Sequence, residues 1–134
     1  CPSEVWVKRG SHCHLASCNT GDMQHAREQC SSFGATVASV HDVNEELFVE
    51  WLAMSEQSID GISCGVNGSM YLGLTSNGIG WVWDDDSTFD FNNWGTGEPS
   101  DDSDSRCVVL VTPEKVWNDV PCNITAGYIC KLNV

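Results

Sequence analysis

Basic side chains are scarce in this chain. It has six lysines and arginines against 19 aspartates and glutamates, which gives a formal net charge of −13. Nucleic acids and anionic membrane surfaces are bound mainly through lysine and arginine, so both repel a chain of this charge. We therefore expect no nucleic-acid partner. A divalent cation is a better complement, because clustered carboxylates destabilise a fold until something screens them.

Long apolar runs are missing as well. No stretch approaches the roughly 18 residues of a membrane-spanning helix, so we expect no membrane insertion. The chain opens on Cys1 without the charged and apolar regions of a signal peptide, as expected of a mature or trimmed domain. A length of 134 residues suits one domain with a modest core. We assign residues 1–134 to a single domain.

The chain also lacks a recognisable catalytic motif. Its four histidines all lie in the N-terminal third, and none belongs to a Ser-His or Cys-His motif. His12 and His14 are neighbours on one face of a predicted strand, but a zinc site needs further ligands. We expect no enzyme activity.

Cysteine, in contrast, is abundant. Eight cysteines stand apart without any Cys-x-x-Cys pair, which favours disulfides over a zinc or redox site. Such a framework indicates a secreted, extracellular protein, and the N-glycosylation triplets that begin at Asn67 and Asn123 agree with this. Whether either asparagine is glycosylated stays open, and eight cysteines alone allow 105 connectivities.

Two amphipathic helices are predicted in the first half of the chain. Apolar residues recur at helical spacing over residues 22–34, where Gly34 is placed as a C-cap. The second helix begins after Asp42, which forms a capping-box pattern with Glu45. We expect the apolar stripe of each helix in the core: Met23, Ala26, Cys30 and Phe33 in the first, and Leu47, Phe48, Trp51 and Leu52 in the second.

Loops and strands are predicted for the rest of the chain. Residues 54–69 carry few apolar side chains and are expected to form a loop held by Cys64. Two helices followed by short strands indicate the α+β class. The strands are expected around Val7 and Cys13 and at residues 71–74, 80–83, 107–111 and 127–131.

A long polar loop over residues 84–105 separates two of these strands. Loops of this length in a compact domain are usually functional. Its first residues, Asp84-Asp85-Asp86, are interpreted as a turn.

Hard oxygen ligands gather at the end of that loop. Glu98, Asp101, Asp102 and Asp104 are followed, beyond Cys107, by Asn118-Asp119. Calcium takes six to eight oxygens from carboxylates, amide carbonyls and water. Taken one by one, these acids are ordinary solvated turn residues. Taken together between two cysteines, they favour a metal site.

In this order, the motifs resemble those of the C-type lectin-like domain family over essentially the whole chain. Residues 71–74 are similar to the family's Trp-Ile-Gly-Leu strand, residues 80–83 to its Gly-x-Trp-x-Trp type hairpin, and Asn93-Trp94 to the Asn-Trp before its binding loop. The most specific signature is residues 117–119, Trp-Asn-Asp, followed by Cys122. The resemblance implies a disulfide-stapled fold with two helices packed on small antiparallel sheets and a long calcium-binding loop.

The resemblance also implies a disulfide pairing. The family's two shared bridges correspond to Cys30 with Cys130 and Cys107 with Cys122, and its long form adds Cys1 with Cys13. That pattern leaves Cys18 and Cys64 for each other.

In sugar-binding members, one calcium ion is held by a Glu-Pro-Asn or Gln-Pro-Asp triplet, a carboxylate before the next cysteine, and the Asn-Asp pair. Two vicinal sugar hydroxyls then replace calcium-bound waters. The resemblance implies that the same residues bind calcium and carbohydrate here: Glu98, Ser100, Asp104, Asn118 and Asp119. Pro99 matches the proline that the family holds in a cis peptide.

This chain departs from the family pattern at two positions. Ser100 stands where the family has Asn or Asp, and its hydroxyl is a weaker ligand that can donate or accept. The extra carboxylate would fall at Ser105, so Asp104 is the nearest acid. Carboxylates are also absent at Ser76 and Asn77, where an auxiliary calcium site would need them, so we expect one calcium.

The predicted function is therefore secreted, calcium-dependent carbohydrate binding. Glu98 slightly favours mannose-type over galactose-type ligands, and cell-surface glycans or microbial polysaccharides are the expected partners. Useful avidity would depend on a homo-oligomer, on which the sequence is silent. The alternative is a C-type lectin-like domain that binds protein without calcium.

Overall fold

The structure, a computed structural model, describes residues 1–60 and 64–134. These residues form two α-helices, a short 3-10 turn (η1) and eight strands. The helices are α1 (Met23–Ser31) and α2 (Val43–Asp60), and η1 is Val66–Gly68. The strands are β1 (Val7–Arg9), β2 (His12–Gly21), β3 (Thr36–Val37), β4 (Ser69–Ser76), β5 (Trp81–Trp83), β6 (Cys107–Val111), β7 (Val116–Val120) and β8 (Ala126–Asn133).

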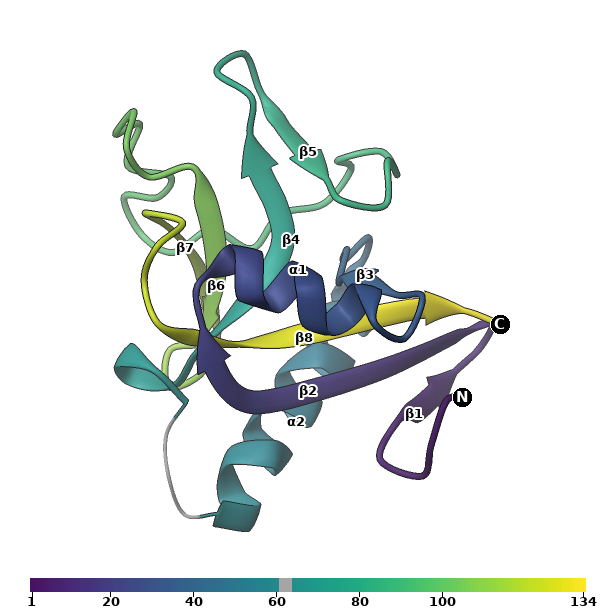
Figure 1. The fold of residues 1–134 in the computed structure, drawn as a ribbon. Coiled ribbons are helices and arrows are strands. Elements are labelled where there is room, and N and C mark those ends of the chain that lie inside the picture. Colours follow the sequence, from purple (N-terminus) through teal and green to yellow (C-terminus); the bar gives the residue numbers. More distant parts are fainter. Residues whose placement is uncertain (61–63) are drawn as a thin grey trace.

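The eight strands form one connected sheet in the order β1-β2-β8-β4-β6-β7, with β3 on β8 and β5 on β4. Among the described strands, β4 and β8 pair in parallel and every other pairing is antiparallel. Figure 1 shows β2 and β8 crossing the lower half, while β4 carries the chain up to β5 and the long loop. The α+β class is confirmed, and the two helices pack on one mixed sheet in place of the small antiparallel sheets that the resemblance implied.

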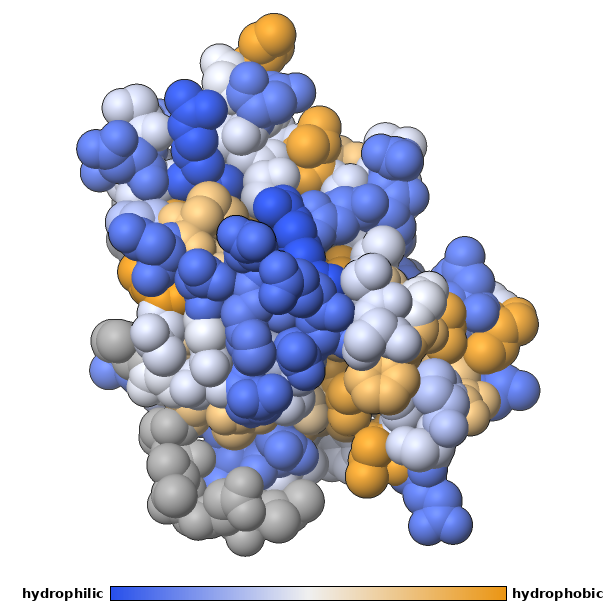
Figure 2. All heavy atoms as spheres, viewed as in Figure 1, coloured by the Kyte–Doolittle hydropathy of each residue, from blue (hydrophilic) through white to orange (hydrophobic). Residues whose placement is uncertain are grey.

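Helix α1 forms where the sequence predicts it. Asp22 caps it by accepting a hydrogen bond from the His25 backbone N–H at 2.9 Å, and its predicted core positions up to Cys30 are buried. The helix ends at Ser31, so Phe33 leaves the stripe and is 46% exposed, lying edge-on to Trp6. The prediction for Phe33 was wrong because the chain turns there, with the Cys30 carbonyl accepting from Phe33 N–H. The polar side of α1 covers the centre of the face in Figure 2.

Helix α2 begins with the predicted cap. The Asp42 side chain accepts from Glu45 N–H at 2.8 Å, and the Glu45 side chain accepts from His41 N–H at 2.8 Å. The prediction that the Leu47 and Trp51 side chains are buried was wrong, because they are 56% and 55% exposed.

The inward face of α2 instead carries three buried glutamates among small apolar residues. Two of these glutamates have partners in the core. The Glu45 carboxylate lies 2.7 Å from Lys131 Nζ, and the Glu46 side chain accepts a hydrogen bond from Trp117 Nε1 at 2.8 Å. Carboxyls with such partners can be buried, and they set the helix orientation. The inward residues are Glu45, Glu46, Val49, Glu50, Leu52 and Ala53.

The predicted loop over residues 54–69 is shorter than expected. Helix α2 continues to Asp60, and residues 61–63 lie outside the described residues. Cys64 is tied to Cys18, as the family pattern implied. All four implied disulfides are present: Cys1–Cys13, Cys18–Cys64, Cys30–Cys130 and Cys107–Cys122.

Aromatic contacts fasten the long loop to the sheet. Trp117 on β7 is fully buried, and its ring lies edge-on to Phe91 and Trp94 with centroids 5.9 Å away from each. Trp83 makes the same type of contact with Phe89 at 6.2 Å. These contacts give the polar loop a fixed course beside β7. No described helix is long and apolar enough to cross a membrane.

Candidate functional site

The end of the long loop runs beside β7. Trp94 bridges to Trp117, the Trp117 N–H donates to the Asn93 carbonyl at 2.9 Å, and Gly95 N–H donates to the Trp117 carbonyl at 2.9 Å. Three residues further on, the Glu98-Pro99 peptide is cis. This course brings Glu98 and Ser100 to the Asn118-Asp119 step of β7. The structure therefore joins two segments that the sequence separates.

Asp119 is the centre of the hydrogen bonding. Its Oδ1 accepts from the Ser100 backbone N–H and its Oδ2 accepts from the Ser100 hydroxyl, both at 2.8 Å. Burial alone would raise the pKa of Asp119, but hydrogen bonds from Glu98 and Ser100 outweigh it and the pKa is lowered. Asp119 is the better ionised member of the site.

Glu98 has the opposite behaviour. Its hydrogen bond with Asp119, followed by burial and the charge of Asp119, raises the pKa of Glu98. Its Oε2 is buried and has no hydrogen-bond partner within residues 1–60 and 64–134. Two carboxyls this close disfavour each other's ionisation, so Glu98 holds its proton more strongly than an isolated glutamate does. The unpartnered oxygen and the two neighbouring carboxyls fit a place for a hard cation.

Asn118 and Asp119 point to opposite sides of β7, as successive strand residues do. Asn118 lines a cavity of about 360 Å³ together with Glu98 and Asn67. A Cβ on Gly95 would lie 3.0 Å from the Asn118 Oδ1, so glycine leaves this amide its space.

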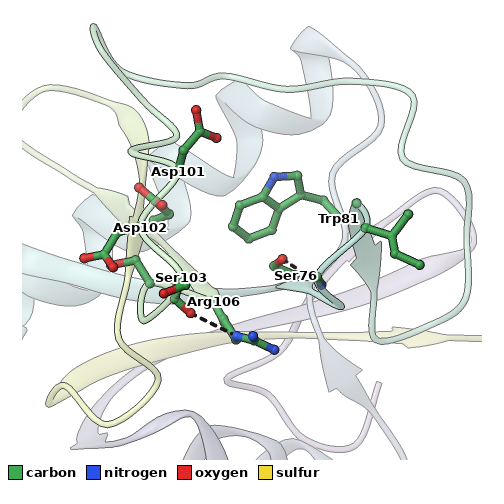
Figure 3. A pocket seen from close by; sticks show the side chains of 11 residues that line it. Ser76, Trp81, Asp101, Asp102, Ser103 and Arg106 are labelled. Atoms are coloured by element: carbon green, nitrogen blue, oxygen red, sulfur yellow. Dashed lines mark hydrogen bonds between the residues drawn. The ribbon is translucent and has the colours of Figure 1, made fainter.

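A second cavity of about 360 Å³ opens on the Asp119 side, between the β4–β5 hairpin and the loop over residues 101–106. Figure 3 shows the Trp81 indole facing Asp101 and Asp102 across it, with Arg106 at one end. Arg106 Nε donates to the Ser103 carbonyl at 3.0 Å. The site thus lies on a ridge between two polar hollows.

Asp104 does not join the other four predicted ligands in the described contacts. Its backbone N–H donates to the Asp102 side chain at 3.0 Å, and the residue is exposed, whereas Ser105 is buried and lines the cavity beside Asp119. In the described part of the chain, no three His, Cys, Asp or Glu side chains gather closely enough to hold a metal. The assignment of Asp104 stays a prediction.

Asn77 and the acidic run of residues 84–86 are both used in local contacts of turns. The Asn77 side-chain oxygen accepts from the N–H groups of Ile79 and Gly80, both at 2.9 Å, and so is used within the hairpin turn. The run of residues 84–86 forms the predicted turn, with Asp84 paired to Arg27 at 3.0 Å and Asp85 accepting from Ser39 Oγ at 2.6 Å.

A second carboxyl pair lies beneath β7, and sequence reasoning missed it. Burial, together with a hydrogen bond from Glu50, raises the pKa of Glu46 to about 8. Trp117 Nε1 donates to Glu46, so this pair supports the strand that carries Asn118 and Asp119. The four-residue spacing of Glu46 and Glu50 was the available signal, but on a helix it usually marks an exposed face.

The chain matches the family model described as Lectin C-type domain over residues 19–132. It is similar to the type-2 ice-structuring protein of Brachyopsis segaliensis, 25% identical over 97% of this chain and 71% of that protein. It is 30% identical to the C-type mannose receptor 2 of Homo sapiens over 94% of this chain, but spans 8% of that receptor. The solved herring type II antifreeze protein superposes with a TM-score of 0.84 at 28% identity, with coverage of 100% of this chain and 99% of that chain.

The family match extends from β2 to β8 and includes the whole candidate site. The fold, the four disulfides and the Trp-Asn-Asp strand agree with it. The chain belongs to the C-type lectin domain family.

Proposed function

We propose that this domain is a secreted lectin that binds saccharides through a calcium ion. The observation that carries the proposal is the Glu98–Asp119 pair, in which one buried carboxyl oxygen has no partner among the described residues. Family members are binding proteins rather than enzymes. The fold is shared with a mannose receptor and with ice-structuring proteins. The ligand therefore has to be inferred from the site and not from the fold.

Glu98, Ser100, Asn118 and Asp119 would hold the ion, and the ion would supply two coordination positions to vicinal sugar hydroxyls. Asp119 is positioned for this by its two hydrogen bonds from Ser100. Asn118 keeps an amide oxygen and an amide nitrogen at the cavity wall, where they can accept from and donate to sugar hydroxyls. Asp104 is proposed as the fifth member, reached by movement of its exposed loop.

Ser100 is one of the two positions where this site differs from the family pattern. Its hydroxyl donates to Asp119 at 2.8 Å and accepts from Asp102 N–H at 3.3 Å. One lone pair therefore remains for the ion or for a sugar hydroxyl. We propose that Ser100 mainly orients Asp119, and that Glu98 and Asn118 make most of the direct contacts with sugar.

Mannose-type sugars are the proposed ligand class, with galactose-type sugars second. Glu98 at the first position of the triplet supports this order. The partners would be cell-surface glycans or microbial polysaccharides, and their repeated residues would reward a homo-oligomer through avidity.

A glycan array probed in calcium and again in EDTA tests the proposal. We expect saturable binding that EDTA removes, and a rise in unfolding free energy of about 2.7 kcal/mol when calcium is present at 100 times its Kd. Magnesium at the same concentration is the control. Binding that survives EDTA would contradict the calcium-bridged mechanism.

A calcium-independent protein-binding domain is the second candidate. One observation favours it: Leu47, Trp51 and Met54 on α2 are 56%, 55% and 41% exposed and line a hollow of about 580 Å³ with Lys115. Exposed apolar groups of this size often mark protein contacts. Saturable, calcium-dependent hits on the array would favour the lectin over this alternative.

A further inference from the structure

The first N-glycosylation triplet, Asn67-Gly68-Ser69, lies at η1 and the start of β4. Asn67 lines the same cavity of about 360 Å³ as Glu98 and Asn118. The fold thus brings a modification sequence to the wall of the proposed saccharide site.

The Asn67 side chain is available for modification. The residue is exposed, and no hydrogen bond within the described residues uses its amide. The amide of Asn93 differs, because its Nδ2 donates to the Lys115 carbonyl at 2.8 Å. The Asn93 amide is therefore used in a hydrogen bond, whereas the Asn67 amide is free within the described residues.

Hydrogen bonds from two side chains hold the backbone turn at Asn67 and Gly68 in place. Gly68 has a φ of 66°, and its carbonyl accepts from Thr112 Oγ1 at 3.1 Å and from Gln57 Nε2 at 3.5 Å. A side chain at position 68 would collide with both Gln57 and Thr112. Asn67 is therefore held at the cavity wall.

The Ser69 hydroxyl supplies an independent observation. Its Oγ is buried and has no hydrogen-bond partner in the described part of the chain. A buried hydroxyl without a partner costs the folded state free energy, so packing gives no reason for serine here. The glycosylation triplet does give one, because it requires Ser or Thr two residues after the asparagine.

We propose that Asn67 carries an N-linked glycan and that this glycan shields the saccharide site. The first half concerns the modification alone, and the second half rests on the proposed function. In the transfer, Asn67 Nδ2 bonds to C1 of the first sugar of a lipid-pyrophosphate-linked oligosaccharide. The bond from that C1 to the pyrophosphate oxygen breaks, the lipid pyrophosphate leaves, and the amide gives up one proton.

The glycan then competes with external saccharides. Its first residues occupy the cavity that Glu98 and Asn118 line. A group tethered there acts at an effective concentration in the millimolar range, comparable with weak single-sugar affinities. Removing it raises the affinity for external saccharide about two- to tenfold.

The test uses the full chain secreted from cultured animal cells. Intact mass before and after enzymatic removal of N-glycans gives the occupancy of Asn67, and mannose-agarose in calcium gives the retention. Asn67→Gln and Ser69→Ala both remove the triplet, and Ser69→Ala also removes the unpartnered hydroxyl, so that variant is expected to fold at least as stably as the wild type. Asn123→Gln is the matched control, because it removes the other triplet, in the turn before β8.

We expect Asn67→Gln and Ser69→Ala to lose the mass of one glycan and to be retained more strongly, while Asn123→Gln is retained like the wild type. An unmodified Asn67 would overturn the inference. A modified Asn67 with equal retention in all variants would overturn the shielding. If no form binds any saccharide in calcium, the proposed function and the shielding both fail, and the masses still decide the modification site.

Discussion

Two pairs of carboxyl groups meet β7, and they differ in what surrounds them. Glu46 and Glu50 lie in the core, where the Trp117 indole donates to Glu46. Glu98 and Asp119 lie on a ridge between two open cavities, two residues further along the strand. Each pair has the same chemistry, two acids in one place.

The difference in surroundings decides what neutralises each pair. Within residues 1–60 and 64–134, Glu46 has no ion-pair partner, and burial raises its pKa to about 8, so Glu46 keeps its proton at neutral pH and the core pair carries at most one charge. In the ridge pair the two pKa values move apart, and the cavities leave room for a cation and its waters. Burial thus makes one pair a proton site and leaves the other fit for a metal.

The largest expected effect comes from removing a charge on the ridge. Asp119→Asn keeps the acceptor for Ser100 N–H but loses a charged ligand, so calcium affinity should fall at least about 100-fold. Calorimetric titration with calcium measures it. Glu46→Gln is the matched control, since it removes a core carboxyl but keeps an oxygen that can accept from Trp117 Nε1, and it should leave the calcium affinity within about twofold. Equal losses of calcium affinity in the two variants would contradict selective binding of the metal at the Glu98–Asp119 pair.

The core pair gives the next largest effect, on stability. The folded-state pKa of Glu46, about 8, lies above its ordinary value of 4.5. Below pH 4.5 both states are protonated. Between pH 4.5 and 8 only the unfolded state ionises, so stability falls by up to about 1.4 kcal/mol per pH unit. Glu46→Gln cannot ionise and should be more stable than the wild type at pH 8, by at most the roughly 5 kcal/mol that this slope gives between pH 4.5 and 8.

Urea unfolding at pH 5 and pH 8, in EDTA, measures this difference. Glu45 should have the opposite effect, because burial is outweighed there by His14 at 3.6 Å and Lys131 at 2.7 Å, and the pKa of Glu45 is lowered to about 2. Its stabilisation is present above pH 4.5 and is lost as the pH falls toward 2. A wild-type protein equally stable at pH 5 and 8 would show that Glu46 is ionised in the core.

The two carboxyl pairs also differ in whether the sequence predicts them. The ridge pair was predictable because motifs mark it: a Glu-Pro triplet and a Trp-Asn-Asp strand, each before a cysteine. The disulfides and most strands were predictable for the same reason. The core pair was hidden, because a helix pattern places glutamate outside and leucine inside unless a partner across the core is known.

Helix α2 illustrates the limit. Leu47 and Trp51 satisfy helical periodicity as well as Val49 and Ala53 do, and the outcome depends on Lys131 and the Trp117 indole. These partners come from strands far along the chain. The choice between Asp104 and Ser105 as the residue near Asp119 is a second example. Only the course of the backbone decides which of two adjacent loop residues faces the cavity.

A smaller effect is expected on the pH dependence of the ridge. The raised pKa of Glu98 means that protons compete with calcium at a higher pH than they would at an isolated glutamate, so calcium affinity should fall by up to about tenfold per pH unit as the pH drops below that pKa. Calorimetry in two buffers of different ionisation enthalpy counts the released protons. The Asp119→Asn variant should release fewer. Calcium binding without proton release would show that both carboxyls are already ionised.

The smallest effect is expected at Asp104, which is exposed and makes no described contact with the ridge pair. If its loop moves toward the ion, Asp104→Asn should weaken calcium binding about two- to threefold, because one distant charge is lost in a solvated loop. Asp102→Asn is the matched control in the same loop. A loss as large as that of Asp119→Asn would make Asp104 a full ligand, whereas no loss beyond the control would remove it from the site and leave Ser105 to face the ion.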